Sequence, residues 1–319
     1  MIPAYPVDAD VQLNDQGTWP ASIHHFDERA VAALRAAEAC GRPLLVRGSP
    51  GVGKSQTARA AAAFAERPFL SVVIDGRTEA HDLMWRFDAV RRLSDAQATR
   101  RDALLAEEAS YVEPQALWWA YDWVSAASKS GEHPPPCERP HNWDPENNRA
   151  VLLIDEIDKA DPDLPNALLE ILANKGFRVP YGGQLVRCGD QNRPLVVITT
   201  NEERELPSAF LRRCLVLTLE LPEGKSALCN YLVDIGQRHE RFLLTKRAGR
   251  CFVMQQAAER LWDAREGARK AAEYMPGTAE FLDLINALSA LWPDDAKAQI
   301  QSIERLDEFA FRKSVPSRA

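Results

Sequence analysis

The feature that most constrains this chain is a glycine-rich segment directly after a short apolar run. The run is Leu44–Val46, and the residues from Gly48 to Ser55 read GSPGVGKS before an alanine-rich stretch, 56–66. A strand candidate, then G-x-x-x-x-G-K-S, then a helix candidate is the arrangement of a phosphate-binding loop. A glycine-rich turn with a chance lysine is the alternative, and the flanking strand and helix argue against it.

Each residue type in this segment suits phosphate binding. Glycines let the backbone turn its N–H groups toward phosphate oxygens, and the next helix offers the positive end of its dipole. Lys54 would reach the β- and γ-phosphates, and the Ser55 hydroxyl would bind Mg²⁺. The predicted binding residues are Gly48, Ser49, Pro50, Gly51, Val52, Gly53, Lys54, Ser55 and Gln56.

A second motif follows about 100 residues later. The apolar run Ala150–Ile154 leads into Asp155 and Glu156. At the end of a strand, Asp155 would hold Mg²⁺, and Glu156 would act as the general base on an attacking water. Acidic turns after strands are common, so this assignment depends on its pairing with Lys54. The separation exceeds one strand–helix unit and predicts an insertion over about 77–149.

Two further polar sites follow downstream strands. Asn201 comes after the apolar run Pro194–Thr199 and could hydrogen-bond a γ-phosphate, although a simple asparagine turn is the alternative. Arg212 and Arg213 end a short helix predicted over 206–214. They are either solvated surface charges or arginines that reach the γ-phosphate of a neighbouring subunit.

The order of elements predicts the fold class. Buried strands alternate with helices, so we expect a three-layer α/β P-loop domain with a parallel sheet over 23–222. A polar arm, 1–22, precedes it, and a hairpin is expected at about 177–188 around two glycines. After residue 222 the strands cease, and 223–319 is expected to form a small all-helical domain.

The insertion has its own composition. We expect a helix over 82–98, continuing helical structure over 103–109, and an aromatic-rich helix over 114–129. Its aromatic residues are expected to pack in a core rather than bind a cofactor; they are Trp118, Trp119, Tyr121 and Trp123. The next loop holds His133, Cys137 and His141, but structural zinc takes four ligands, so we expect no metal there.

Overall composition argues against several classes of protein. The net charge of −7 argues against a nucleic-acid binder. The six cysteines form no C-x-x-C pair, which favours free thiols in a reducing compartment. The first residues lack the pattern of a signal peptide, and no apolar stretch approaches the length of a membrane span. We therefore expect a cytoplasmic protein without membrane contact.

Taken together, the motifs resemble those of AAA+ ATPases. The segments that carry the resemblance are GSPGVGKS, LLIDEIDKA and ITTNEERELPSAFLRRC, followed by the helical tail. The segments DEIDKADPDLPNALLEIL and PGTAEFLDLINAL are similar in sequence to segments of the MoxR family, which belongs to the helix-2-insert, magnesium-chelatase-like branch. The resemblance covers about residues 25–292. It implies that Gly48–Ser55 is the Walker A loop and that Asp155 and Glu156 are the Walker B pair. It also implies that Asn201 is the sensor-1 residue.

The resemblance also implies an activity and partners. It implies ATP and Mg²⁺ as ligands, hydrolysis to ADP and phosphate, and a homo-oligomeric, typically hexameric, ring with Arg213 or Arg212 as the arginine finger. Such proteins act as chaperone-like remodellers of a client protein, often beside a partner with a von Willebrand factor A domain. The place of the sensor-2 arginine matches 276–279, which holds none. A nucleotide-dependent binding switch with slow turnover therefore stays an alternative.

Overall fold

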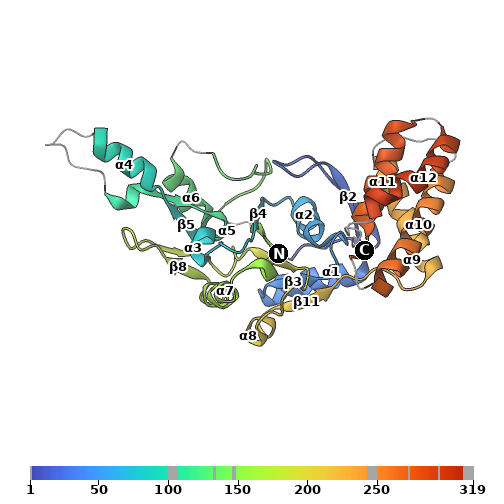
Figure 1. Cartoon of the computed structure of the whole chain (residues 1–319). Helices are drawn as coiled ribbons and strands as arrows, with labels where there is room; N and C mark the ends of the chain where they lie inside the picture. The colour runs from blue at the N-terminus through green and yellow to red at the C-terminus, as the bar shows by residue number, and fades with distance from the viewer. Residues whose placement is uncertain are drawn as a thin grey trace. The chain divides into compact units, whose positions relative to one another are not determined.

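Five short apolar strands form the parallel sheet of the fold (Figure 1). In this computed structural model their order across the sheet is β11-β3-β10-β7-β4. They are β3 (Leu44–Arg47), β4 (Phe69–Val73), β7 (Val151–Asp155), β10 (Leu195–Thr200) and β11 (Leu215–Thr218). The central strands are buried almost throughout, as expected where helices cover both faces. The predicted α/β class with a parallel sheet is confirmed.

The structure describes residues 2–98, 107–131, 134–145, 149–242, 250–271, 274–293 and 295–311. The chain divides into two compact units. The first comprises residues 1–47 and 55–217, and the second comprises residues 48–54 and 218–319. The domain limits expected from the sequence, 23–222 and 223–319, stay a prediction.

Register places the ends of the two motif-bearing strands side by side. β10 pairs in parallel with β7, with Val197 opposite Leu153 and Ile198 opposite Ile154. On its other side, β10 pairs in parallel with β3. Because parallel strands present their carboxyl ends at one edge, the residues after β7 and β10 lie at the same edge of the sheet.

Helices flank the sheet (Figure 1): α1 (Glu28–Cys40), α2 (Lys54–Phe64), α7 (Asp163–Asn174) and the short α8 (Ser208–Leu211). The start of α1 is fixed by Asp27, whose carboxylate accepts from the N–H of Ala30 at 2.7 Å. Its end is fixed by Gly41, whose φ of 58° is the left-handed conformation common after a helix. The chain then turns directly into β3.

The N-terminal region departs from the polar arm that the sequence predicts. It forms an antiparallel hairpin of β1 (Ala9–Leu13) and β2 (Ser22–Phe26). Leu13 and Phe26 are buried, so the hairpin has an apolar side that packs into the unit. Its strands are only five residues long and mostly polar, which is why their pattern is weak in the sequence.

A buried charge network ties the start of the chain to this unit. The carboxylate of Glu38 in α1 is 1% exposed and pairs with Arg67 and with Arg149. The Tyr5 hydroxyl also donates to it, at 3.1 Å. Burial and the nearby Glu38 charge raise the pKa of Tyr5 well above its usual value. The network joins four separate segments around one carboxylate.

The insertion between β4 and β7 is more segmented than predicted. The helix expected over 82–98 is interrupted by a strand: the structure has α3 (Ala80–Met84), β5 (Trp85–Phe87) and α4 (Ala89–Ala98). β5 pairs with β6 (Val112–Pro114), so a distant partner overrides local helical preference. Most of the helical stretch expected over 103–109 lies outside the described residues. Glu108–Tyr111 (η1) is a 3₁₀ turn.

The aromatic stretch of the insertion is a core element, as predicted. It forms two helices rather than one, α5 (Ala116–Tyr121) and α6 (Trp123–Ser130), because Asp122 caps the second by accepting from the N–H of Ser125 at 2.9 Å. Its four large aromatic residues are buried: Trp118, Trp119, Tyr121 and Trp123. They pack with the apolar residues of the main sheet.

The predicted hairpin is present as β8 (Gly176–Arg178) and β9 (Leu185–Arg187). Gly182 and Gly183 both have positive φ at its tip. The hairpin contacts the insertion through Tyr181, whose ring stacks on Phe87 at 4.5 Å between centroids. Trp85 meets the same ring edge-on at 5.5 Å. Aromatic rings therefore pack the β8–β9 hairpin against strand β5 of the insertion.

The described residues after 222 are helical, as predicted, and form α9 (Lys225–Phe242), α10 (Arg250–Ala271), α11 (Thr278–Leu291) and α12 (Ala296–Phe311). They share one apolar core that includes Leu232, Leu261, Phe281 and Ile303. Among the described residues, no helix is long and apolar enough to cross a membrane. All six cysteines are free thiols.

Candidate functional site

The two motifs found in the sequence meet in the structure. The Ser55 hydroxyl, on the first turn of α2, donates to the Asp155 carboxylate, with Oγ 2.9 Å from Oδ1 and 3.0 Å from Oδ2. Ser55 and Asp155 were the two predicted Mg²⁺ ligands. The strand β7 carries Asp155 to its carboxyl end, where open α/β sheets bind their ligands.

The glycine-rich loop folds back around its own lysine. The Lys54 ammonium donates to the carbonyl oxygens of Gly48, at 2.8 Å, and of Ser49, at 2.9 Å. Gly51 and Gly53 have φ values of 76° and 94°, which side-chain-bearing residues rarely adopt. The loop from Gly48 to Lys54, which also contains Pro50 and Val52, therefore curls in the manner that a phosphate-binding loop requires. Gln56 follows within α2 and accepts a 3.4 Å hydrogen bond from Ser22.

Thr199 links the acidic pair to the neighbouring strand. Its hydroxyl donates to Asp155 Oδ1 and accepts from the backbone N–H of Glu156 at 3.0 Å. It is fully buried on β10. Sequence reasoning missed this residue, because a threonine inside an apolar strand carries no distinguishing signal. The link fixes both Asp155 and the backbone of Glu156.

Glu156 is held in an unusual conformation at the end of β7. Its φ of 61° and ψ of 46° are left-handed, which is uncommon for a residue with a long side chain. Its Oε2 accepts from the Lys159 ammonium at 2.7 Å, and its Oε1 lies 3.4 Å from Asn201 Nδ2. The hydrogen bond to Glu156 raises the pKa of Lys159. Glu156 and Asn201, predicted from separate motifs, thus lie side by side.

Asp158 positions the turn that carries Asn201. Its carboxylate is buried, and Oδ2 accepts from the backbone N–H groups of Asn201, at 3.1 Å, and Glu203, at 3.0 Å. It lies in the 3₁₀ turn Ile157–Lys159 (η2), directly after the acidic pair. The sequence does show an extra acidic residue here, and its burial is what marks it as a backbone anchor.

Arg212 and Arg213 lie apart from this group. They follow α8 and precede β11, and both side chains are exposed. Two strands, β3 and β10, separate β11 from β7 in the sheet. Within the described part of the chain, no hydrogen bond or ion pair joins either arginine to Asp155 or Glu156. The structure therefore does not bring the arginine pair to the acidic pair of its own subunit.

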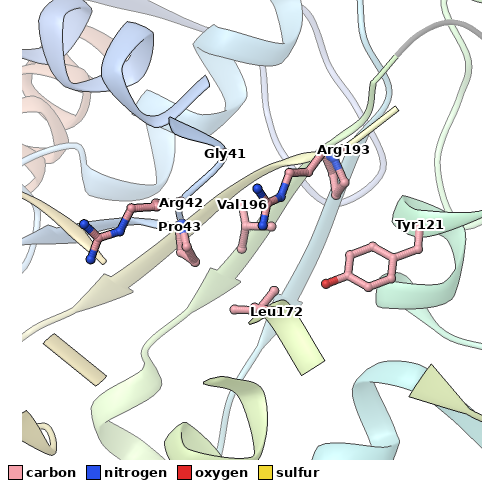
Figure 2. A pocket seen from close by; sticks show the side chains of 8 residues that line it. Gly41, Arg42, Pro43, Tyr121, Leu172, Arg193 and Val196 are labelled. Carbon is pink, nitrogen blue, oxygen red and sulfur yellow. The ribbon is translucent and has the colours of Figure 1, made fainter. Parts of the chain in front are cut away.

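A small pocket lies near the start of this arginine turn (Figure 2). It measures about 20 Å³ and is lined by Gly41, Arg42, Pro43, Tyr121, Leu172, Arg193, Pro194 and Val196. A larger cavity, of about 560 Å³, lies among the turn 16–19, the start of β4 and the loop 134–139. Neither cavity is lined by a predicted site residue, so the candidate site is defined by its polar contacts.

The donor set fits the two ligands that the motifs imply. A hydroxyl and a carboxylate are hard oxygen donors of the kind Mg²⁺ takes. A lysine ammonium on a loop of curled glycines fits a phosphate group. Among the described residues, no cluster of three or more His, Cys, Asp or Glu could hold a metal ion. Cys137 and His141 thus form no such cluster, and His133 lies outside the described residues.

Comparison with known families agrees with this geometry. Residues 43–214 match the AAA domain of the dynein-related subfamily. This match spans more than half of the chain. The chain belongs to this family. The AAA domain contains the glycine-rich loop, the acidic pair, Asn201 and the arginine pair. No curated protein matches the sequence.

Several solved structures have a similar fold at low sequence identity. One is a provisionally named ATPase from Cytophaga hutchinsonii, 14% identical, which covers 88% of this chain and 78% of its own, with a TM-score of 0.38. Another is the Thermotoga maritima RuvB Holliday junction branch migration motor, 16% identical, which covers 88% of this chain and 68% of its own, with a TM-score of 0.45. A point variant of that RuvB is 15% identical, with a TM-score of 0.48.

Proposed function

We propose that this AAA protein binds ATP with Mg²⁺ and hydrolyses ATP to ADP and phosphate. The observation that carries the proposal is the contact between Ser55 and Asp155, with Glu156 and Asn201 beside it. Two oxygen ligands for a cation and a carboxylate for water are then at one edge of the sheet, and the glycine-rich loop for phosphate directly precedes Ser55 in the chain. These are the parts that phosphoryl transfer needs.

In this proposal the loop binds and orients the triphosphate. Its backbone N–H groups contact phosphate oxygens, and Lys54 exchanges its hydrogen bonds to the Gly48 and Ser49 carbonyls for bonds to the β- and γ-phosphates. Ser55 and Asp155 would hold Mg²⁺, which neutralises charge on the phosphates. Gln56, on the first turn of α2, is the last of the proposed nucleotide-binding residues. Thr199 keeps the Asp155 carboxylate in place through its hydroxyl.

Glu156 acts on the water. Its carboxylate accepts a proton from the attacking water, and Asn201 orients that water or the γ-phosphate. Its left-handed backbone aims the side chain, and Thr199 fixes that backbone by accepting from its N–H. Lys159 competes for the same carboxylate and must release it before the base can work.

Arg213 or Arg212 acts on the site of a neighbouring subunit. The arginine pair is exposed, and two strands separate its strand from the one that ends in the acidic pair of the same chain, which supports action on a second copy. A guanidinium there stabilises the charge that develops on the transferred phosphoryl group. We therefore propose a homo-oligomeric ring, with six subunits as the expected number.

We further propose the MoxR type of function, in which hydrolysis drives remodelling of a client protein, with a von Willebrand factor A domain protein as one class of partner. The alternative is a nucleotide-dependent binding switch that turns over slowly. The two share the same pocket and differ in whether assembly and rapid turnover accompany ATP binding.

The experiment is the mass in solution of wild type and Glu156→Gln, without nucleotide and with ATP and Mg²⁺. The remodeller hypothesis predicts that ATP drives assembly of a ring of about six subunits. It also predicts that the Glu156→Gln variant, which retains ATP, stays assembled. A protein that stays monomeric with bound ATP would contradict it and favour the switch. The trapped ring is then the bait for a client.

A further inference from the structure

The turn that carries Arg212 and Arg213 is held by a third arginine. Arg42, between α1 and β3, donates from Nε to the carbonyl oxygen of Arg213 at 3.1 Å and from Nη2 to the carbonyl oxygen of Arg212. We propose that Arg42 is a positioning residue, which fixes the backbone of the arginine pair so that the pair reaches the nucleotide of a second copy. This inference rests on the proposed function and names a residue outside the recognised motifs.

The carbonyl oxygens that Arg42 contacts need partners. Arg212 is the C-cap of α8 and Arg213 follows it, so both carbonyls lie at or beyond the end of the helix, where no helical partner is available. The Arg42 guanidinium donates to both with one planar group. A positive charge at the end of a helix also interacts favourably with the helix dipole. Arg42 therefore closes α8 in a defined geometry.

The same turn is anchored on both sides. Phe210 is fully buried before the arginine pair, and Cys214 is buried after it. The N–H of Leu215 then donates to the carbonyl oxygen of Pro43 at 2.9 Å, next to Arg42. Arg212 and Arg213 thus have exposed side chains, while their backbone is held by Phe210 before them, by Arg42 at their carbonyls and by Cys214 after them.

Charge on this surface points to an anionic partner. The Arg42 guanidinium lies against the backbone carbonyls of Arg212 and Arg213, whose own side chains are exposed. Among the described residues, none of the three forms an ion pair with a carboxylate. In the proposed ring, a triphosphate bound to a second copy supplies the anion that the exposed guanidinium groups of Arg212 and Arg213 face.

The direction of Arg42 separates it from its neighbour in the pocket. Figure 2 shows the Arg42 side chain pointing away from Arg193, which lies across the pocket. Arg193 packs against Gly41 and, among the described residues, makes no hydrogen bond to the arginine turn. Arg193→Ala is therefore a matched control, because it removes a guanidinium from the same pocket without removing a donor to the Arg212 and Arg213 carbonyls.

The first test is the steady-state turnover of full-length variants. Arg42→Ala should lower kcat for ATP about 10- to 100-fold, with little change in KM, because misplacing a charged group by about 1 Å has an effect of that size. Arg42→Lys keeps the charge but lacks the planar fork, so it should not restore kcat. Arg193→Ala should stay within about twofold of wild type. Full kcat in Arg42→Ala, or full rescue by Arg42→Lys, would overturn the proposal.

The second test is mixing of subunits. If Arg42 acts through the arginine pair, its defect lies in what a subunit gives to its neighbour. Mixed oligomers of Arg42→Ala with Glu156→Gln should regain turnover, because the intact arginine turn of one faces the intact acidic pair of the other. Oligomers of Arg42→Ala with the double variant Arg212→Ala/Arg213→Ala should not. Equal recovery in both mixtures, or none in either, would overturn the proposal.

The mixture of the double variant with Glu156→Gln separates this inference from the proposed function. Recovery of turnover there establishes that the arginine pair acts on a second copy. If this mixture regains turnover while Arg42→Ala behaves as wild type, only the proposed role of Arg42 is wrong. If this mixture does not regain turnover, the proposal of a trans-acting arginine is wrong, and so is the proposed role of Arg42. Far-ultraviolet circular dichroism and mass in solution check that each variant is folded and assembled.

Discussion

Ser55 Oγ lies 2.9 Å from Asp155 Oδ1, although 100 residues separate the two in the chain. The contact joins the start of α2 to the end of β7. It is the clearest point at which two motifs recognised separately become one site. It also makes both residues dependent on each other, since each holds the other's side chain through this hydrogen bond.

We predict that Ser55→Ala weakens the response to Mg²⁺. Loss of the hydroxyl leaves Asp155 as the predicted protein ligand, so the Mg²⁺ concentration for half-maximal turnover should rise at least tenfold. Titration of Mg²⁺ at fixed ATP measures this. Ser55→Thr is the control, because it retains a hydroxyl and phosphate-binding loops accept either residue. An unchanged Mg²⁺ response in Ser55→Ala would contradict the assignment.

Glu38 should matter for stability rather than for turnover. Glu38→Gln leaves Arg67 and Arg149 without the carboxylate they share, so the free energy of unfolding should fall by about 3 kcal/mol. Urea unfolding followed by tryptophan fluorescence measures the change. The exposed Glu170, on α7, provides the control: Glu170→Gln should stay within about 0.5 kcal/mol of wild type. Equal effects of the two substitutions would argue against a buried network.

The N-terminal hairpin should lose stability in mild acid because of His24. Burial lowers the pKa of His24 to about 4, with Asp27 opposing and His25 adding to the shift. Its ring packs edge-on to Phe26 at 5.0 Å. Between the folded value and the ordinary value of about 6.5, the unfolded chain binds the proton and the folded chain does not. Stability therefore rises with pH across this window and is lost as the pH falls below 6.5.

The measurement for His24 is urea unfolding of wild type and His24→Gln at pH 7.5 and pH 5. Wild type should lose about 2 kcal/mol more than the variant over this interval, since only wild type carries the buried imidazole. The difference in unfolding free energy between wild type and His24→Gln at pH 7.5 measures the effect of the substitution that does not depend on protonation. An equal loss in both proteins would show that the pH dependence arises elsewhere.

The sequence predicts the parts of this fold that depend on strong local patterns. The strand that ends in Asp155 and the strand that precedes Asn201 are continuous apolar runs followed by polar residues. The structure of the insertion is harder to predict, because β5 forms by pairing with β6 and by stacking of Phe87 on Tyr181 rather than through its own sequence pattern. The β1–β2 hairpin escapes prediction for a similar reason.

The candidate site divides in the same way. Residues that belong to a motif of defined residue types and spacing, such as Lys54 and Glu156, can be identified from the sequence. Residues that support them cannot, because Thr199 and Asp158 matter through hydrogen bonds to distant backbone groups. Arg42 is the extreme case, since it meets the Arg212–Arg213 turn 170 residues away. Such contacts depend on the completed fold and leave no pattern in the chain.

The most direct test of the proposed ATPase is one sample measured in two ways: ATP turnover, and nucleotide retained after rapid desalting, for wild type and Glu156→Gln. The structure predicts that wild type turns over ATP and retains ADP. It predicts that Glu156→Gln retains ATP, with turnover lowered at least about 100-fold, because the loop and Mg²⁺ ligands remain while the base is lost. Undiminished turnover in Glu156→Gln would contradict the role of Glu156, and failure of both proteins to retain nucleotide would contradict the site itself.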